Sequence, residues 1–91
     1  MKKILKNASA LMFVLACSPA FAGANCPKYP KADWMPEADA KAKIESMGYK
    51  IRKFKVDGNC YEIYGHNKEG KKAEVYFDAK TLAVVKAEIE K

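Results

Sequence analysis

The sequence has 91 residues, of which 17 are Lys or Arg and 11 are Asp or Glu, and its formal net charge is +6. Removal of residues 1–22, argued below, would leave 91 − 22 = 69 residues, which form one domain near the lower limit for a self-supporting hydrophobic core. Three of the basic residues, Lys2, Lys3 and Lys6, lie in a segment that we expect to be removed, so the other 14 against 11 acidic residues leave a net charge of +3. That balance does not predict a nucleic-acid partner.

Residues 1–22 have the three parts of an export signal. The three lysines precede an apolar run at residues 8–16, about half the ~20 residues that span a bilayer. Ala20-Phe21-Ala22 then supplies the small-x-small pattern that signal peptidase recognises. We therefore predict cleavage after Ala22 and a periplasmic or secreted protein. The alternative is a lipoprotein, because Val14-Leu15-Ala16-Cys17 approximates a lipobox, and only lipidation at Cys17 would attach the protein to a membrane.

Two cysteines remain after this cleavage, Cys26 and Cys60. Such a pair forms a disulfide in an oxidising compartment, and closing a loop of 34 positions stabilises a chain by about 4 kcal/mol in the entropy model. A redox or metal-binding pair is the alternative, but the spacing is not the Cys-x-x-Cys that favours it. Residues 23–35 contain two prolines and no hydrophobic period, so we expect them to form an extended lead-in to a domain at residues 36–91.

One amphipathic helix is predicted over residues 36–47. A proline suits its first turn, and acidic residues follow at the positive end of the helix dipole. Ala40, Ile44 and Met47 recur at i, i+4 and i+7, which predicts one apolar stripe facing the core. Gly48 follows directly, as is typical of a helix C-terminus.

Turn residues predict the register of the strands that follow. Lys68-Glu69-Gly70 suits a three-residue hairpin loop with its glycine in the left-handed position. Because side chains alternate along a strand, this loop pairs apolar or small residues on one face: Tyr61 with Phe77, Ile63 with Val75, and Gly65 with Ala73. The small pair would let the helix come close to the sheet. The opposite, outer face then carries Glu62 beside Tyr76, Tyr64 beside Glu74, and His66 beside Lys72.

The strand before this hairpin is joined by a two-residue loop, at Asp57-Gly58 or at Gly58-Asn59, which places Phe54 and Val56 on the inner face. Ile51 has the other parity, so we expect either a bulge near Arg52-Lys53 or an outward-facing Ile51. Residues 82–89 are expected to form a fourth strand. The predicted fold class is therefore α+β, with one N-terminal helix packed on a three- to four-stranded antiparallel meander sheet closed by one disulfide.

Cys60 has the parity of the outer face of this sheet. A disulfide to Cys26 would therefore draw the lead-in around the sheet edge or across the outer face. Residues 28–34 would then cover part of the surface that Tyr64 and Tyr76 form.

Four stretches carry a resemblance to a known family: Trp34-Met35-Pro36-Glu37, residues 40–49, Asp57-Gly58-Asn59-Cys60-Tyr61-Glu62-Ile63, and Val75-Tyr76-Phe77-Asp78. Together they resemble the PepSY family of small extracytoplasmic domains. The resemblance implies a helix-and-sheet fold and a peptidase-inhibiting or peptidase-regulating role, since such domains occur in propeptides of thermolysin-type metalloproteases and in cell-envelope proteins. The family has no agreed catalytic residues, so none is assigned. Such domains usually place a glycine in the turn after the third-strand aspartate, where this chain has Thr81-Leu82.

Side chains suited to catalysis are sparse. His66 and Cys60 lie six strand residues apart, roughly 20 Å, which is too far for a Cys-His nucleophile. Glu62 and Glu74 are diagonal neighbours, which we interpret as part of a solvated cross-strand network. The histidine and the methionines lack the spacing of metal ligands. We expect no enzymatic activity, no cofactor and no metal site.

Aromatic residues are the best candidates for function. The candidate partner-binding surface comprises Trp34, Glu62, Tyr64, Glu74 and Tyr76, and the alternative is that the lead-in covers these aromatic side chains in a second small core. A sheet edge is another route for binding an extended peptide, although the first strand is rich in lysine, which discourages pairing.

The expected function is that of a monomeric, exported, non-catalytic protein-binding module. Its partner would be another envelope protein, with inhibition or regulation of an envelope peptidase as the leading role. The alternative is a small-ligand or metal-binding accessory protein of an envelope redox system.

Overall fold

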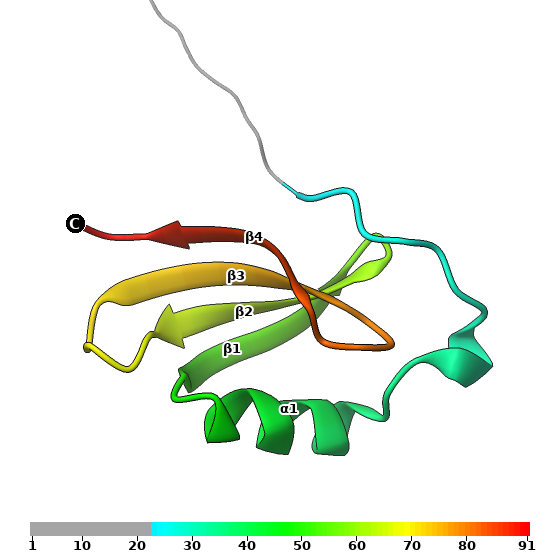
Figure 1. Cartoon of the computed structure of the whole chain (residues 1–91), viewed down its shortest axis with the longest axis horizontal. Helices are drawn as coiled ribbons and strands as arrows, with labels where there is room; N and C mark the ends of the chain where they lie inside the picture. The colour runs from blue at the N-terminus through cyan, green and yellow to red at the C-terminus, as the bar shows by residue number, and fades with distance from the viewer. Residues whose placement is uncertain (1–22) are drawn as a thin grey trace, which may run out of the picture.

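The computed structural model describes residues 23–91 (Figure 1). The expected signal peptide and the lipobox at Cys17 lie outside the described residues. Five elements form the body of the molecule, after a short 3-10 turn η3 (Lys31–Asp33): α1 (Glu37–Ser46), β1 (Lys50–Asp57), β2 (Cys60–His66), β3 (Lys72–Asp78) and β4 (Val84–Ile89). The four strands form one antiparallel sheet in the order β1-β2-β3-β4, with α1 along one face, so the α+β meander is confirmed.

Helix α1 begins after Pro36 and buries Ala40 and Ile44 completely against the sheet. Burying a side chain the size of Ile44 contributes about 2 kcal/mol. The expectation for Met47 was wrong, because its side chain is 40% exposed. The helix ends at Ser46 and Met47 is its C-cap, so the apolar spacing continues one position beyond the part of the helix that covers the core.

The predicted register of β2 and β3 is confirmed at every pair, from Tyr61 opposite Phe77 to His66 opposite Lys72. Pairing of β1 with β2 slips between Ile51 and Lys53. The bulge turns Ile51 inward, where it packs against the core. Asp57 pairs with Cys60, so the loop between β1 and β2 is Gly58-Asn59.

The reason for a glycine at position 65 differs from the expected one. A Cβ atom there would overlap the backbone carbonyl of Lys50 and crowd the amide of Arg52 on the neighbouring strand. The bulge in β1 brings that backbone close, and only glycine leaves room for it. The requirement therefore comes from the adjacent strand and not from the helix.

The core lies between α1 and the inner face of the sheet, where Ile63, Val75 and Phe77 are completely buried. The turn after β3 completes it. Leu82 is 2% exposed and has φ 64°, so a leucine is held in the left-handed conformation in the turn where the resemblance led us to expect a glycine. Strand β4 consequently begins at Val84, two residues later than predicted.

Asp78 organises the turn that holds Leu82. Its Oδ1 accepts hydrogen bonds from the amides of Lys80 (2.8 Å) and Thr81 (2.9 Å), and its own amide donates to the carbonyl of Ala83 (2.8 Å). Burial acts to raise the pKa of Asp78, but hydrogen bonds from the two backbone N–H groups and from the side chains of Tyr29 and Thr81 together outweigh it and hold the pKa below its ordinary value.

Candidate functional site

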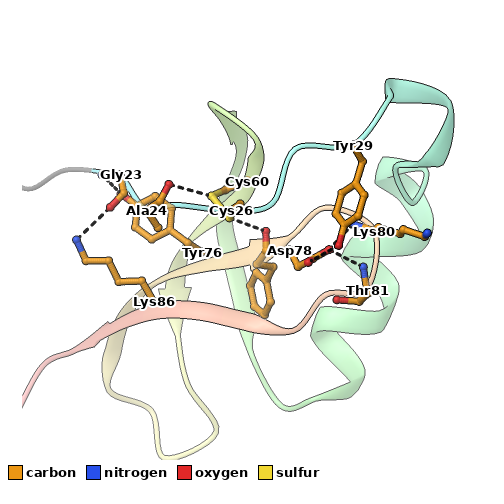
Figure 2. Close-up of a disulfide and its surroundings, with 11 residues drawn as sticks. Gly23, Ala24, Cys26, Tyr29, Cys60, Tyr76, Asp78, Lys80, Thr81 and Lys86 are labelled. Atoms are coloured by element: carbon orange, nitrogen blue, oxygen red, sulfur yellow. Dashed lines mark hydrogen bonds between the residues drawn. A yellow bond between two sulfur atoms is a disulfide. The ribbon is translucent and has the colours of Figure 1, made fainter.

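The lead-in crosses the end of the sheet from the outer face to the inner face (Figure 2). A disulfide joins Cys26 to Cys60, with their Cα atoms 5.4 Å apart, as the sequence predicted. Beyond it, the hydroxyl of Tyr29 donates to Asp78 Oδ2 at 2.9 Å. Trp34 then packs edge-to-face on Tyr61, with ring centroids 5.3 Å apart, so the lead-in contributes to both faces.

This path corrects two expectations. The residues that lie over Tyr76 are Gly23 and its neighbour Ala24, not residues 28–34. Trp34 belongs to the inner core with Tyr61, so it cannot share a surface with Tyr64 and Tyr76. The sequence gives the parity of each strand residue, but it does not give the direction of an extended segment after a disulfide.

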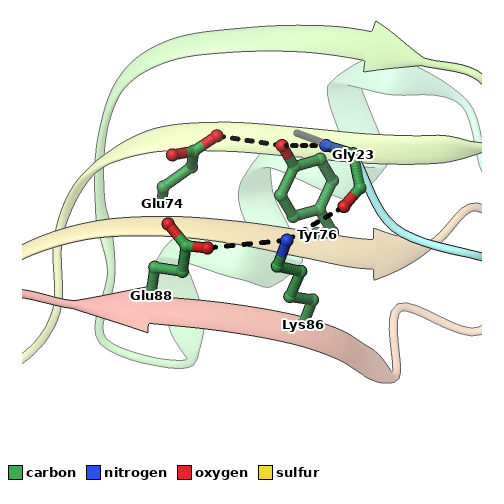
Figure 3. Close-up of polar contacts among 5 residues, drawn as sticks. All are labelled: Gly23, Glu74, Tyr76, Lys86 and Glu88. Carbon is green, nitrogen blue, oxygen red and sulfur yellow. Dashed lines mark hydrogen bonds and ion pairs between the residues drawn. The ribbon is translucent and has the colours of Figure 1, made fainter. Parts of the chain in front are cut away.

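Four of the predicted surface residues, Glu62, Tyr64, Glu74 and Tyr76, do lie together on the outer face, and we call them the acid–tyrosine cluster. The hydroxyl of Tyr76 donates to Glu74 Oε2 at 2.9 Å and accepts a hydrogen bond from the Gly23 amide at 3.0 Å (Figure 3). Tyr76 is 2% exposed and Glu62 is completely buried. The lead-in therefore covers part of this face. This is the alternative that we gave for these residues, in which the lead-in buries the aromatic side chains.

Burial sets the protonation of the two carboxyl groups. Desolvation, followed by the neighbouring Glu74, raises the pKa of Glu62 to about 7. The pKa of Glu74 is lowered, chiefly by the adjacent carboxyl group of Glu62. The pair therefore holds one proton on Glu62 below neutral pH. Lys55 is the nearest cation, with its Nζ 3.9 Å from Glu62 Oε1, and neither Glu62 oxygen has a hydrogen-bond partner among the described residues.

The tyrosine hydroxyls respond to the same charges. The neighbouring Glu62 makes the largest contribution to a pKa of about 12 for Tyr64, and burial raises the pKa of Tyr76. Both hydroxyls stay protonated at any physiological pH, and that of Tyr76 donates to the Glu74 carboxylate.

The exposed members of the cluster line a shallow hollow at the other end of the outer face. The hollow has a volume of about 480 Å³, and its walls include Tyr64 and Glu74 together with Glu88 and Ile89 of β4. Two residues of the predicted surface, Tyr64 and Glu74, thus remain available to a partner. Glu62 and Tyr76 do not, because they are buried.

Strand β4 carries an exposed apolar surface that our sequence analysis did not single out. Val84 is 50%, Val85 38% and Ile89 39% exposed, and β4 is an outer strand of the sheet. The pair of β-branched residues Val84-Val85 could have indicated this surface, but we interpreted it only as part of the predicted fourth strand. The opposite outer strand, β1, instead carries Lys50, Arg52, Lys53 and Lys55.

Within residues 23–91, no group of three or more His, Cys, Asp or Glu side chains is arranged to hold a metal ion. Cys60 is bonded to Cys26 and is not a thiol nucleophile. Among the described helices, none is long and apolar enough to cross a membrane.

Comparison with known proteins identifies the family. No curated protein matches the chain significantly, and no solved structure does. A family model, described as peptidase propeptide and YPEB domain, matches residues 6–88. This match covers most of the chain and all the elements described above except the last residue of β4. The chain belongs to the PepSY_2 family.

Proposed function

We propose that this protein is an exported, non-catalytic module that binds an envelope peptidase and regulates it. Domains of its family are generally non-catalytic propeptide or regulatory modules, typically extracellular or periplasmic. In this proposal residues 1–22 are removed, residues 23–35 form the strap that carries the disulfide, and residues 36–91 form the binding domain. The observation that carries it is the outer edge of β4, where an extended segment of the peptidase would add as a fifth strand.

A hydrogen bond at the C-terminal end of β4 shows which of its residues direct their backbone groups toward β3. The amide of Glu90 donates to the carbonyl of Lys72 at 2.9 Å, so the backbone of Glu90 faces β3. Because antiparallel residues alternate between bonded and non-bonded pairs, the backbone groups of Ile89 and Ala87 face away from β3. They form the row of donors and acceptors that a partner strand would use.

The two edges of the sheet differ in how well they admit such a strand. Four basic side chains and a bulge protect β1, which is how natural sheets discourage pairing. Strand β4 has exposed valine and isoleucine side chains beside its edge, and the hollow of Tyr64 and Glu74 adjoins it through Ile89. Backbone pairing and an apolar contact are therefore offered at the same place.

A matched pair of substitutions tests this edge. Ala87→Pro removes the N–H that faces away from β3, and a sheet tolerates proline at such an edge position. Ala87→Ser keeps this N–H. The oxidised domain is added to the envelope fraction of the source cells, and hydrolysis of fluorescent casein is measured together with cross-linking to peptidases tagged by active-site probes. We expect the wild type and Ala87→Ser to inhibit a probe-labelled peptidase and to cross-link to it. At least tenfold more Ala87→Pro should be needed for the same inhibition.

Two results would count against the proposal. If the wild type neither changes hydrolysis nor cross-links to a labelled peptidase, the regulatory function is wrong. If Ala87→Pro acts like the wild type while its thermal unfolding shows an intact fold, the peptidase binds elsewhere. An independent variant, Ile89→Lys, places a charge beside the same edge and should weaken binding in the same direction.

A further inference from the structure

We propose that the acid–tyrosine cluster is a binding site for the α-ammonium group that cleavage after Ala22 creates at Gly23. The occupant is the new N-terminus of the same chain. The inference rests on the predicted cleavage position and is independent of the peptidase-binding function.

The structure holds Gly23 at both of its backbone groups (Figure 3). Its nitrogen lies 3.0 Å from the hydroxyl oxygen of Tyr76, and its carbonyl oxygen accepts a hydrogen bond from Lys86 Nζ at 3.1 Å. The next residue is held as well, because the carbonyl oxygen of Ala24 contacts the Cys60 sulfur at 3.5 Å. The nitrogen of Gly23 is thus placed by contacts that do not involve the residues before it.

The surroundings of that nitrogen are acidic on three strands. On β3, the Tyr76 hydroxyl links it to the Glu74 carboxylate through two successive hydrogen bonds of 3.0 and 2.9 Å. On β2, Glu62 is the cross-strand partner of Tyr76. On β1, Asp57 Oδ1 lies 4.0 Å from the point that a Cβ of Gly23 would occupy.

The buried carboxyl group of Glu62 indicates that a hydrogen-bond donor is missing. Its side chain is 1% exposed, its two oxygens have no hydrogen-bond partner among residues 23–91, and its nearest cation is 3.9 Å away. A buried carboxylate left in this way is costly unless a charge or a donor compensates it. An amide at Gly23 has one N–H, which Tyr76 uses, whereas an α-ammonium has three N–H groups and a positive charge. Cleavage therefore supplies what Glu62 lacks.

The nitrogen of Gly23 already lies within hydrogen-bonding distance of the Tyr76 hydroxyl, at 3.0 Å. An ammonium group held there would be shielded from aminopeptidases, so the processed chain would keep its first residue.

The test compares two forms that differ by one residue. The processed form begins at Gly23 and is prepared by export, with its mass confirming the first residue; the extended form retains Ala22, which keeps the Gly23 amide and moves the ammonium one residue away. Both are oxidised and unfolded in urea at pH 7. We expect the equilibrium constant for unfolding to be about tenfold smaller for the processed form, as for one charge-assisted hydrogen bond in a partly buried place.

Coupling to the cluster is tested by Glu62→Gln, with Glu45→Gln on the exposed side of α1 as the control. The tenfold difference should shrink to less than twofold in Glu62→Gln and persist in Glu45→Gln. Tyr76→Phe is the second cluster variant, should Glu62→Gln not fold. The α-amine of the processed wild type should also react at least fivefold more slowly with an acylating reagent than that of the urea-unfolded chain.

Three results would overturn the proposal. The first is equal stability of the processed and extended forms. The second is a difference that survives both cluster variants, which would show that the ammonium acts elsewhere. The third is a natural first residue other than Gly23 in the exported protein.

Discussion

Replacing Glu62 by glutamine should change how the stability of this domain depends on pH. The relevant protein is the extended form that retains Ala22, where no ammonium group lies at Gly23. Burial, and then Glu74, raise the pKa of Glu62 from 4.5 to about 7. The folded state consequently holds a proton that the unfolded state has released over this interval, so the free energy of unfolding falls as pH rises from 4.5 to about 7.

The size of this fall follows from the pKa difference. Each pH unit between 4.5 and about 7 removes at most 1.36 kcal/mol, which gives an upper limit of about 3 kcal/mol. We expect about 1–2 kcal/mol, because Lys55 lies 3.9 Å from Glu62 and relaxation admits water. Glu74 and Asp78 do not cancel it. Their folded-state pKa values are lowered, so their contribution is present above their ordinary pKa values of 4.5 and 3.8 and is lost below them.

The extended form with Glu62 in place, called the wild type in this experiment, should therefore rise in stability from acid pH to a maximum near pH 4.5–5, fall until about pH 7 and then level off. Urea unfolding of the oxidised protein, followed by circular dichroism at half-unit steps from pH 3.5 to 8.5, measures this curve. Glu62→Gln has no proton to release, so it should lack the descending part and be the more stable protein at pH 8. A wild-type curve that is level or rising between pH 5 and 7, or a variant that keeps the descent, would refute the reasoning.

Three further changes probe the lead-in and the turn after β3. Reduction of the Cys26–Cys60 disulfide, which closes a span of 34 positions, should cost about 4 kcal/mol in urea unfolding, and a loss below about 1 kcal/mol would contradict its anchoring role. Leu82→Ala should lower the free energy of unfolding by about 2–4 kcal/mol, because it removes a buried side chain. Leu82→Gly should be about 1 kcal/mol more stable than Leu82→Ala, because glycine relieves the left-handed strain at this position. If Leu82→Gly instead melts at a lower temperature than Leu82→Ala, that strain is excluded. Tyr29→Phe removes the hydrogen bond to Asp78 and should lower the midpoint of urea unfolding at pH 7, and this loss should disappear as Asp78 protonates at acid pH.

The register of the sheet could be predicted because local rules determine it. The hairpin loop at residues 68–70 and the alternation of apolar residues agree on one pairing, and a slip by one residue would expose the inner face. Ile51 illustrates the same rule, since its parity predicted either a bulge or an outward-facing side chain, and the structure has the bulge in β1. These features depend on neighbours in the sequence or directly across a turn.

Features that depend on the lead-in could not be predicted in the same way. The sequence places Glu62 on the outer face beside Tyr76, but its burial depends on where an extended segment more than 30 residues earlier crosses the sheet. Trp34 was assigned to the wrong face for the same reason. Cys60 held a partial signal, because it lies two residues from Glu62 on the same face and brings the lead-in there.

The order in which this molecule folds is a consequence of that lead-in. The sheet is a meander of adjacent strands, so its contacts are local and form quickly, whereas the lead-in reaches partners 49 to 63 positions away. Contacts that close such large loops form late, and disulfide formation takes seconds to hours. We expect a translocated chain to pass through a stage in which helix and sheet are formed, the outer face is bare and both thiols are free. During that interval we expect the supply of oxidant, rather than the chain itself, to set the rate at which the disulfide forms.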